Sequence, residues 1–276
     1  MQKIKVITDS TVDIPKDILE ENNIETLPML INFNEESYLD GIDIDTKMMF
    51  KKISELGTLP TTAQVTPNRF CECFERNLKE GYKLIVLTLS SEMSGTYQSA
   101  CIAKDMIGSQ DIEIIDSRNV TAGLGLLVLK AVKLSKEGLS LLEVKEEVLK
   151  TIPCVKSSLG FESLEYLIKG GRLSKTAGII GTVLGIRLIL EVKEGKMSVK
   201  EKLRGSKRAV KKIIDDFEKL GHNPNDPVIL LHIENEDIYE ALKEYLNSRN
   251  IKYIDSEVGC TVGVHSGPKA CGLFFI

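Results

Sequence analysis

Hydroxyl side chains and a glycine directly follow an apolar run in the segment LIVLTLSSEMSGTYQSA, residues 84–100. Ser94, Gly95 and Thr96 stand where the apolar residues 84–89 give way to a segment with helical spacing. Hydroxyls, backbone N–H groups and the positive end of a helix dipole suit a small anion, either a carboxylate or a phosphate. The segment also fits an ordinary helix N-cap, because serine and threonine begin many helices. Taken alone, it leaves both interpretations open.

Two further apolar runs in the first half of the chain also end in polar turns. These turns are TDST at residues 8–11 and DSRNVT at 116–121, in addition to SSEMSGT at 90–96. Strand-like and helix-like segments alternate in this half, which predicts a mostly parallel sheet. The carboxyl ends of parallel strands meet at one edge, where α/β sheets bind ligands. We therefore expect the three turns to gather there.

Apolar periodicity and turn residues predict the remaining elements. Expected strands are 3–8, 26–33, 84–89, 112–115, 157–161, 188–193, 197–203, 228–233 and 251–256, and expected helices are 46–55, 94–107, 123–136, 141–151, 164–169, 206–220 and 237–249, with others beginning at Pro15 and Pro67. Residues 34–45 and 58–67 are expected to be loops. The fold class is thus α/β, with a parallel domain at 1–153 and a mixed-sheet domain at 154–276.

Composition excludes several classes of protein. The 276 residues carry 36 basic and 40 acidic side chains, for a net charge of −4, so no overall positive field attracts nucleic acid. The chain has no tryptophan and only 5% aromatic residues, which disfavours base stacking. We see no signal peptide, and the apolar stretch 178–192 is too interrupted to span a bilayer. Six cysteines fit reduced thiols in the cytoplasm, where we expect the protein, and we expect no metal site.

Seven motifs occur in one order along almost the whole chain. They are ITDSTVDIP at 7–15, LPTTAQVTP at 59–67, LSSEMSGTYQSA at 89–100, IDSRNVTAGLG at 115–125, LIKGGRLS at 167–174, KLRGSKRA at 202–209 and VGVHSGPKACGLFF at 262–275. With these motifs the chain resembles the DegV family. These bacterial fatty-acid-binding proteins serve as the lipid-carrying subunit of fatty acid kinase.

The resemblance implies that a ligand binds between the two domains, and it implies which residues contact the ligand and the partner. The carboxylate of a long-chain fatty acid would be held by Thr62 and by Ser94 of the Ser94-Gly95-Thr96 turn. His265 matches a histidine near the head group. Arg172 and Arg204 match arginines that face the kinase. No cofactor is implied, and transient contact with a membrane surface stays open.

Three positions depart from the family pattern. Ala63 replaces the serine of a Thr-Ser-Gln motif, Leu188 replaces a proline, and Lys269 replaces a glycine. They bear on the surroundings of the head group more than on the fold. We expect slot residues at 178–190 and 273–275, where small, branched and aromatic side chains gather.

The expected function is that of a carrier, which presents the fatty acid carboxylate to a separate ATP-dependent kinase and then holds the acyl phosphate for phospholipid synthesis. The chain lacks the G-x-x-x-x-G-K-[ST] loop for binding ATP itself. An alternative is a serine acyl hydrolase with Ser94 as nucleophile, His265 as base and Asp9 or Asp116 as orienting group. The G-x-S-x-G elbow is missing, however. A binding module for another small anion is the third possibility.

Overall fold

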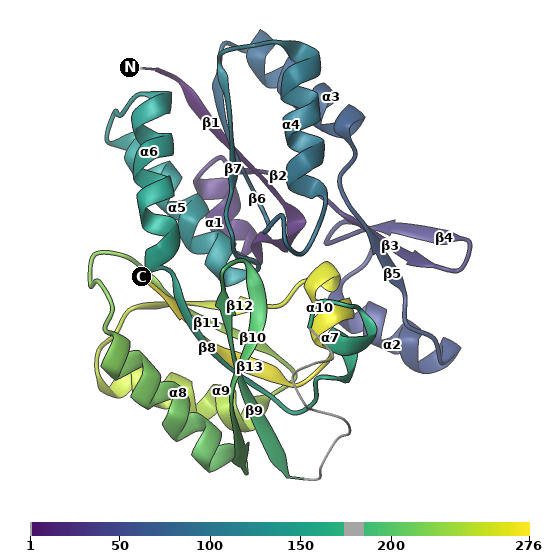
Figure 1. Cartoon of the computed structure of the whole chain (residues 1–276), viewed down its shortest axis with the longest axis vertical. Helices are drawn as coiled ribbons and strands as arrows, with labels where there is room; N and C mark the ends of the chain where they lie inside the picture. Colours follow the sequence, from purple (N-terminus) through teal and green to yellow (C-terminus); the bar gives the residue numbers. More distant parts are fainter. Residues whose placement is uncertain (1, 174–184) are drawn as a thin grey trace.

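The computed structural model of the protein describes residues 2–173 and 185–276, and it confirms an α/β architecture (Figure 1). The first half forms a four-stranded parallel sheet in the order β2-β1-β6-β7. Its strands are β1 (Ile4–Asp9), β2 (Glu25–Leu27), β6 (Lys83–Thr88) and β7 (Ile112–Asp116). β1, β6 and β7 are neighbours, so the three polar turns that follow them meet at one edge, as the sequence predicts.

The second half forms a six-stranded mixed sheet in the order β10-β9-β8-β13-β11-β12. Its strands are β8 (Lys156–Phe161), β9 (Ile186–Lys193), β10 (Lys196–Arg204), β11 (Val228–Ile233), β12 (Tyr253–Glu257) and β13 (Ala270–Phe275). Within this sheet, β11–β12 is the only parallel pair among the described strands, and the other pairs are antiparallel. The strands of the two larger sheets thus fall on either side of residue 153.

Helices cover both sheets, and most begin and end where the sequence predicts. They are α1 (Lys16–Glu21), α2 (Thr46–Leu56), α3 (Pro67–Lys79), α4 (Thr96–Ile107), α5 (Ala122–Lys136), α6 (Leu141–Thr151), α7 (Glu165–Lys169), α8 (Ser206–Leu220), α9 (Glu236–Ser248) and α10 (Cys260–Ser266), with 3-10 turns η1 (Ser10–Val12) and η2 (Ile152–Cys154). Pro67 occupies the first turn of α3, where its missing N–H costs nothing. A Ser140–Glu143 capping box begins α6.

The structure corrects two expectations in the region of residues 26–45. The expected strand 26–33 is two strands, because Pro28 lacks the N–H that a continuous ladder needs. β3 (Leu30–Phe33) leaves the parallel sheet and joins a separate three-stranded sheet. The expected loop 34–45 is also wrong in part, since β4 (Glu36–Leu39) pairs with β3 around a turn at Asn34 with φ 50°.

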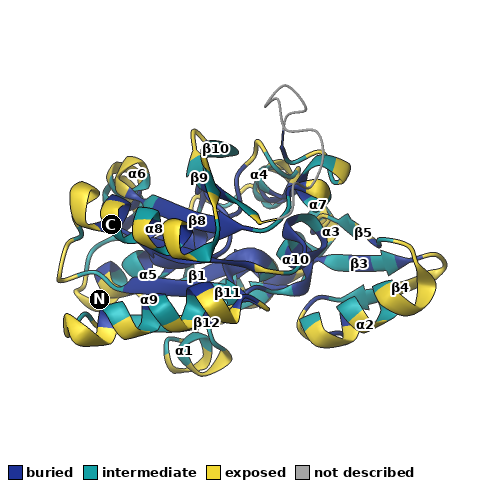
Figure 2. Cartoon of the chain, turned by 90° about the horizontal axis from the view of Figure 1, so that it is seen from below, coloured by how far each residue is buried: buried dark blue, intermediate teal, exposed yellow. Residues whose placement is uncertain are grey.

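A third correction concerns the expected loop 58–67. Its residues Thr61–Ala63 form β5, which pairs with β3 and completes the order β4-β3-β5. This small sheet and α2 extend to one side of the molecule (Figures 1 and 2). Thr62 is therefore held in a strand rather than in an irregular loop.

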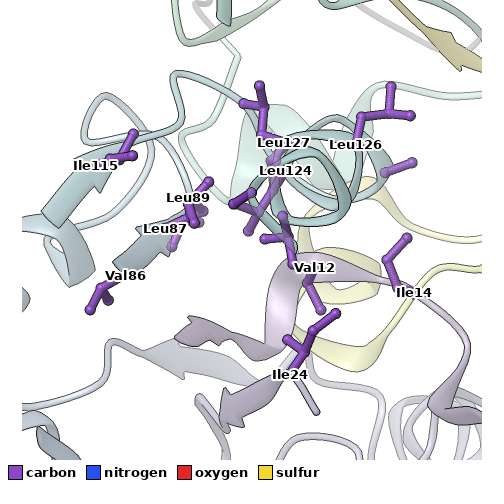
Figure 3. Close-up of a cluster of buried hydrophobic side chains, with 14 of the residues drawn as sticks. Val12, Ile14, Ile24, Val86, Leu87, Leu89, Ile115, Leu124, Leu126 and Leu127 are labelled. Atoms are coloured by element: carbon purple, nitrogen blue, oxygen red, sulfur yellow. The ribbon is translucent and has the colours of Figure 1, made fainter. Parts of the chain in front are cut away.

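The main hydrophobic core surrounds α5, which packs against β1 and β6 on one side and β11 and β13 on the other. Leu124 and Leu127 of this helix are fully buried and lie close to Val12 and Leu89 (Figure 3). Each such side chain contributes about 1.5–3 kcal/mol on burial. The apolar residues that surround nearly the whole of this helix thus join the two larger sheets into one core (Figure 2).

The β9–β10 hairpin extends beyond the part of β8 with which it pairs. β9 pairs with β8 only at residues 188–190. At the tip, Arg118 donates to the carbonyl of Glu194 (2.6 Å), and Glu92 pairs with Arg118 (3.1 Å) and Lys196 (2.9 Å). Gly195, at φ 80°, has the Ser90 hydroxyl 2.5 Å from where a Cβ would stand. The hairpin tip is thus held against the first half of the chain by surface ion pairs and one close backbone approach.

Replacing Gly272 with alanine should destabilise the mixed sheet. An added Cβ would collide with the carbonyl oxygen of Ser158 and lie 2.7 Å from the Cα of Leu159, both of them backbone atoms. Gly160→Ala is the matched control on the neighbouring strand, because its Cβ meets the movable Cδ1 of Ile238 at 2.8 Å. We expect G272A to lower the free energy of unfolding by about 1–3 kcal/mol more than G160A in urea titrations. Equal losses would contradict this account.

Candidate functional site

A cavity of about 1020 Å³, including its opening to solvent, lies between the parallel and the mixed sheet. The apolar residues that line it are Met29, Leu89, Met93, Val120, Leu159, Phe161, Leu167, Val192, Met197, Leu231, Val258, Val262, Ala270, Cys271 and Phe274. Both halves of the chain therefore build its wall.

The predicted slot residues contribute to this wall only in part. Residues 178–184, like Ser174 of the LIKGGRLS motif, lie outside the described residues. Phe274 lines the cavity. Its neighbours Leu273 and Phe275 point to the opposite face of β13 and pack with the α8 and α9 side chains, because side chains alternate along a strand.

Polar groups converge on one end of the cavity. Thr62 of β5, Ser94 and Gly95 of the turn before α4, and His265 of α10 all line it. The Thr62 hydroxyl lies 3.0 Å from Nε2 of His265. The hydroxyl of Ser94 lies 3.0 Å from that of Thr96 and accepts the Thr96 N–H at 3.3 Å. The structure thus brings together residues from three separate motifs, with Thr96 behind Ser94 and not on the cavity wall.

His265 lies in the last turn of α10. Burial, reinforced by the nearby positive charge of Arg172, lowers the pKa of His265 to about 4, so its ring is neutral at neutral pH. Its buried Nδ1 has no hydrogen-bond partner among the described residues. A buried N–H without an acceptor is the rarer defect, so we assign the proton to Nε2, which donates to Thr62. The Thr62 proton is then free for a ligand.

Two buried carboxylates fix the start of α10. Asp40 accepts the N–H groups of Cys260 (3.1 Å) and Thr261 (3.2 Å), and Asp13 accepts that of Gly259 (3.0 Å). Burial raises the pKa of Asp13 well above its usual range, despite a hydrogen bond from Thr121. Both acids come from the first half of the chain, so they set the position of His265 relative to Thr62.

Gln64 is a site residue that sequence reasoning missed. Its side-chain nitrogen donates to Ser99 of α4 at 2.9 Å, and it lines the cavity. Its Oε1 occupies the space that a Cβ on Gly95 would need. The glycine therefore lets the β5 segment approach the Ser94 turn. The available signal was the third position of the Thr62-Ala63-Gln64 motif.

The two predicted arginines are placed differently. Arg172 lines the cavity, and its guanidinium donates to the carbonyl oxygens of Met93 (3.2 Å) and Gly170 (2.6 Å). Arg204, at the end of β10, is exposed and is not among the residues that line the cavity. Arg172 thus places a positive charge beside His265, whereas Arg204 belongs to the surface.

Two of the three departures from the family pattern, Leu188 and Lys269, make contacts of their own in the structure. Leu188 is buried in β9 opposite Phe161 of β8. Lys269 adopts φ 66°, and its ammonium pairs with Glu162 at 3.7 Å. Glu162 also binds Arg187 at 2.9 Å. Neither Leu188 nor Lys269 is among the residues that line the cavity with Thr62 and Ser94.

The groups needed for a hydrolase are not arranged as a triad. Nε2 of His265 contacts Thr62 instead of Ser94, and among the described residues no carboxylate contacts its Nδ1. Asp9 binds Thr11 and the N–H of Leu89, and Asp116 binds Ser91. The geometry therefore favours holding a ligand over attacking one.

Comparison with known proteins agrees with this arrangement. Residues 3–276 match the DegV family, which is described as uncharacterised. The chain belongs to the DegV family. A DegV domain-containing protein of Clostridium acetobutylicum is 54% identical over 276 residues, which cover 100% of this chain and 99% of the relative.

Solved DegV structures share the fold over the full length. A DegV-family protein of Thermus thermophilus, described by its fatty acid binding, has a TM-score of 0.90 at 27% identity and 99% coverage of both chains. DegV of Bacillus subtilis, described as a fatty acid binding protein, has a TM-score of 0.86 at 29% identity and 100% coverage of both chains. Among the described residues of this DegV protein, every helix is too short or too polar to cross a bilayer.

The lowered pKa of His265 predicts acid sensitivity. The unfolded chain takes up this proton near pH 6.5 and the folded chain only near pH 4, so acid favours unfolding in this interval. Relative to His265→Gln, the wild type should lose up to about 3 kcal/mol of stability between pH 6.5 and pH 4. Urea unfolding at a series of pH values measures this difference. Parallel curves for the two proteins would show that His265 titrates normally.

Proposed function

We propose that this DegV protein carries a long-chain fatty acid, with the acyl chain in the cavity and the carboxylate at Thr62 and Ser94. The observation that supports this most is the combination of a mostly apolar wall with the two neutral hydroxyl donors of Thr62 and Ser94. The fatty-acid-binding DegV proteins of similar structure support the same assignment. The acyl chain would lie between the domains at 1–153 and 154–276, and the carrier would act in the cytoplasm.

The acyl chain would supply most of the affinity. A saturated sixteen-carbon acid buries about fifteen methylene and methyl groups at roughly 0.8 kcal/mol each, or on the order of 12 kcal/mol before the costs of binding. A hydrogen bond to a charged group adds about 1.5–3 kcal/mol. The hydroxyls would therefore fix the register and the choice of head group, while the wall would provide the binding energy.

The head group would remain reactive because the donors that hold it, Thr62 and Ser94, are neutral. Arg172 gives two of its N–H groups to backbone carbonyls, and His265 is neutral at neutral pH. Ser94 is half-buried and Gly95 is exposed, so this end of the cavity lies near the surface. A separate fatty acid kinase could then deliver the phosphoryl group of ATP to the carboxylate. Arg172 and Arg204 would face this kinase, and the carrier would keep the acyl phosphate.

The ligand itself provides the first test. Protein purified from cells should release a stoichiometric long-chain fatty acid in denaturing mass spectrometry, and delipidated protein should bind hexadecanoic acid. In the same binding assay, Ser94→Ala and Thr62→Val should each weaken binding by roughly 10–100-fold, since each loses a hydrogen bond to a charged group. Ser91→Ala is the control, because Ser91 lies in the same turn but bonds to Asp116 at 2.5 Å.

Two results would refute the carrier proposal. One is a ligand-free protein that also fails to bind hexadecanoic acid after delipidation. The other is covalent labelling of Ser94 by a fluorophosphonate probe with turnover of acyl esters, which would favour the hydrolase.

A variant at Arg204 tests lipid binding and phosphorylation separately. Because it is exposed and outside the cavity wall, Arg204→Ala should bind hexadecanoic acid like the wild type. Its rate of phosphorylation by a fatty acid kinase should fall about tenfold or more. Lys219→Ala, also exposed and basic but at the far end of α8, is the matched control. A loss of lipid affinity in R204A would contradict the assignment.

A further inference from the structure

The imidazole ring of His265 lies against Gly170, the residue that ends α7. A Cβ built on Gly170 would collide with Nδ1 of His265 and would lie 3.2 Å from its Cε1. A position over the ring face would be nearly as close to Cε1 as to Nδ1, so Gly170 lies beyond the edge of the ring. Because one hydrogen of a glycine points where a Cβ would stand, the Cα–H of Gly170 points at Nδ1.

This contact decides which ring nitrogen carries the proton. Burial and the charge of Arg172 lower the pKa of His265 to about 4, so at neutral pH the ring holds one proton. An N–H at Nδ1 would press its hydrogen against the Cα–H of Gly170, whereas a bare Nδ1 accepts a weak C–H hydrogen bond there. Nδ1 is buried and has no other partner in the part of the chain that the structure describes. The proton therefore lies on Nε2, which is 3.0 Å from the Thr62 hydroxyl.

Gly170 is held in this position by its own backbone bonds and by the packing of α7 on α10. Its carbonyl accepts an N–H of Arg172 at 2.6 Å, and its own N–H donates to the carbonyl of Tyr166 at 2.8 Å. The ring of Tyr166 packs in turn on Gly267, the residue after α10, where a Cβ would lie 2.6 Å from Cγ of the ring. Two glycines thus let α7 and α10 approach closely, and a shift of Gly170 requires a shift of His265.

We propose that Gly170 is a positioning residue of the head-group site, which keeps the proton of His265 on Nε2 and thereby directs the proton of the Thr62 hydroxyl to the ligand carboxylate. With the proton on Nε2, the Thr62 oxygen accepts from His265, and its own proton is free for an anion. With the proton on Nδ1, Thr62 would donate to Nε2 and would turn its lone pairs to the carboxylate. This inference rests on the proposed fatty acid carrier and explains how its site selects an anion.

Nitrogen NMR of the imidazole rings tests the tautomer directly. The full-length protein is labelled with ¹⁵N in its three histidines, and the spectrum of His265→Gln identifies the signals of His265. At pH 7 we expect a protonated Nε2 and an unprotonated Nδ1 in the wild type. Gly170→Ala should lose this pattern, because its backbone at φ −73° accepts alanine and the new Cβ displaces the ring. Gly171→Ala is the matched control: its backbone at φ 71° is strained, but its Cβ meets no atom within 4 Å.

Binding of hexadecanoic acid to the delipidated protein tests whether Gly170 acts through Thr62. We expect G170A to weaken binding by about fivefold to tenfold, and G171A to bind like the wild type. In a Thr62→Val background, adding G170A should change the affinity by less than about twofold, because the hydroxyl that Gly170 directs is already gone. A structural role of Gly170 alone would give the same loss in both backgrounds.

The outcomes separate this proposal from the carrier function. A protonated Nδ1 in the wild type overturns the proposal, and so does a G170A variant that keeps the wild-type nitrogen pattern. Equal losses of affinity from G170A with and without Thr62 also overturn it. If the wild type does not bind hexadecanoic acid, the carrier function fails, while the nitrogen spectra still judge the tautomer. Should G170A not fold, the wild-type spectrum still decides.

Discussion

Buried carboxylates of the first half of the chain set the geometry on which the cavity depends. Asp40 and Asp13 accept the N–H groups at the start of α10, and Asp40 also accepts the Ser10 hydroxyl at 2.8 Å. A buried charge without such partners costs several kcal/mol, so these bonds leave α10 little freedom. Because α10 comes from the second half of the chain, the two halves are joined at the cavity by polar bonds of defined direction. The hydrophobic core around α5 gives cohesion but not this alignment.

The electrostatic character of the head-group end follows from the alignment. His265 faces Thr62 in a site where burial and Arg172 keep its ring uncharged. The guanidinium of Arg172 donates to two backbone carbonyls and places its positive charge beside the cavity. A carboxylate in this environment gains from a positive potential and from neutral donors. Such a setting stabilises an anion without withdrawing its electron density as strongly as a bidentate arginine would.

The sequence predicted the parallel sheet correctly, because β1, β6 and β7 are mostly apolar and end in polar turns. It also predicted most helices correctly, such as α3, which begins at Pro67, and α6. It failed at β3, β4 and β5, which are short and owe their pairing to contacts distant in sequence. No local pattern distinguishes a three-residue strand from a loop.

The sequence predicted residues of the candidate site but not the contacts between them. Motif order placed Thr62, Ser94 and His265 together, yet their bonds depend on the packing of three elements. The contact of Gln64 with Ser99 and the position of Arg172 on the cavity wall emerge only in three dimensions. Phe274 was separable from Leu273 and Phe275 by strand alternation, but the sequence does not say which face of β13 meets the cavity.

The β9–β10 hairpin and α10 form two walls of the cavity that are held in place by different interactions. Val192 and Met197, paired across the hairpin, form part of the wall, while the tip between them is secured by Glu92, Arg118 and Lys196. These side chains are between about a third and two thirds exposed, at 35%, 37% and 64%, so dissolved ions screen their attraction. The bonds of Asp13 and Asp40 are buried and are screened far less. Ionic strength therefore acts on the hairpin wall of the cavity and leaves its α10 wall in place.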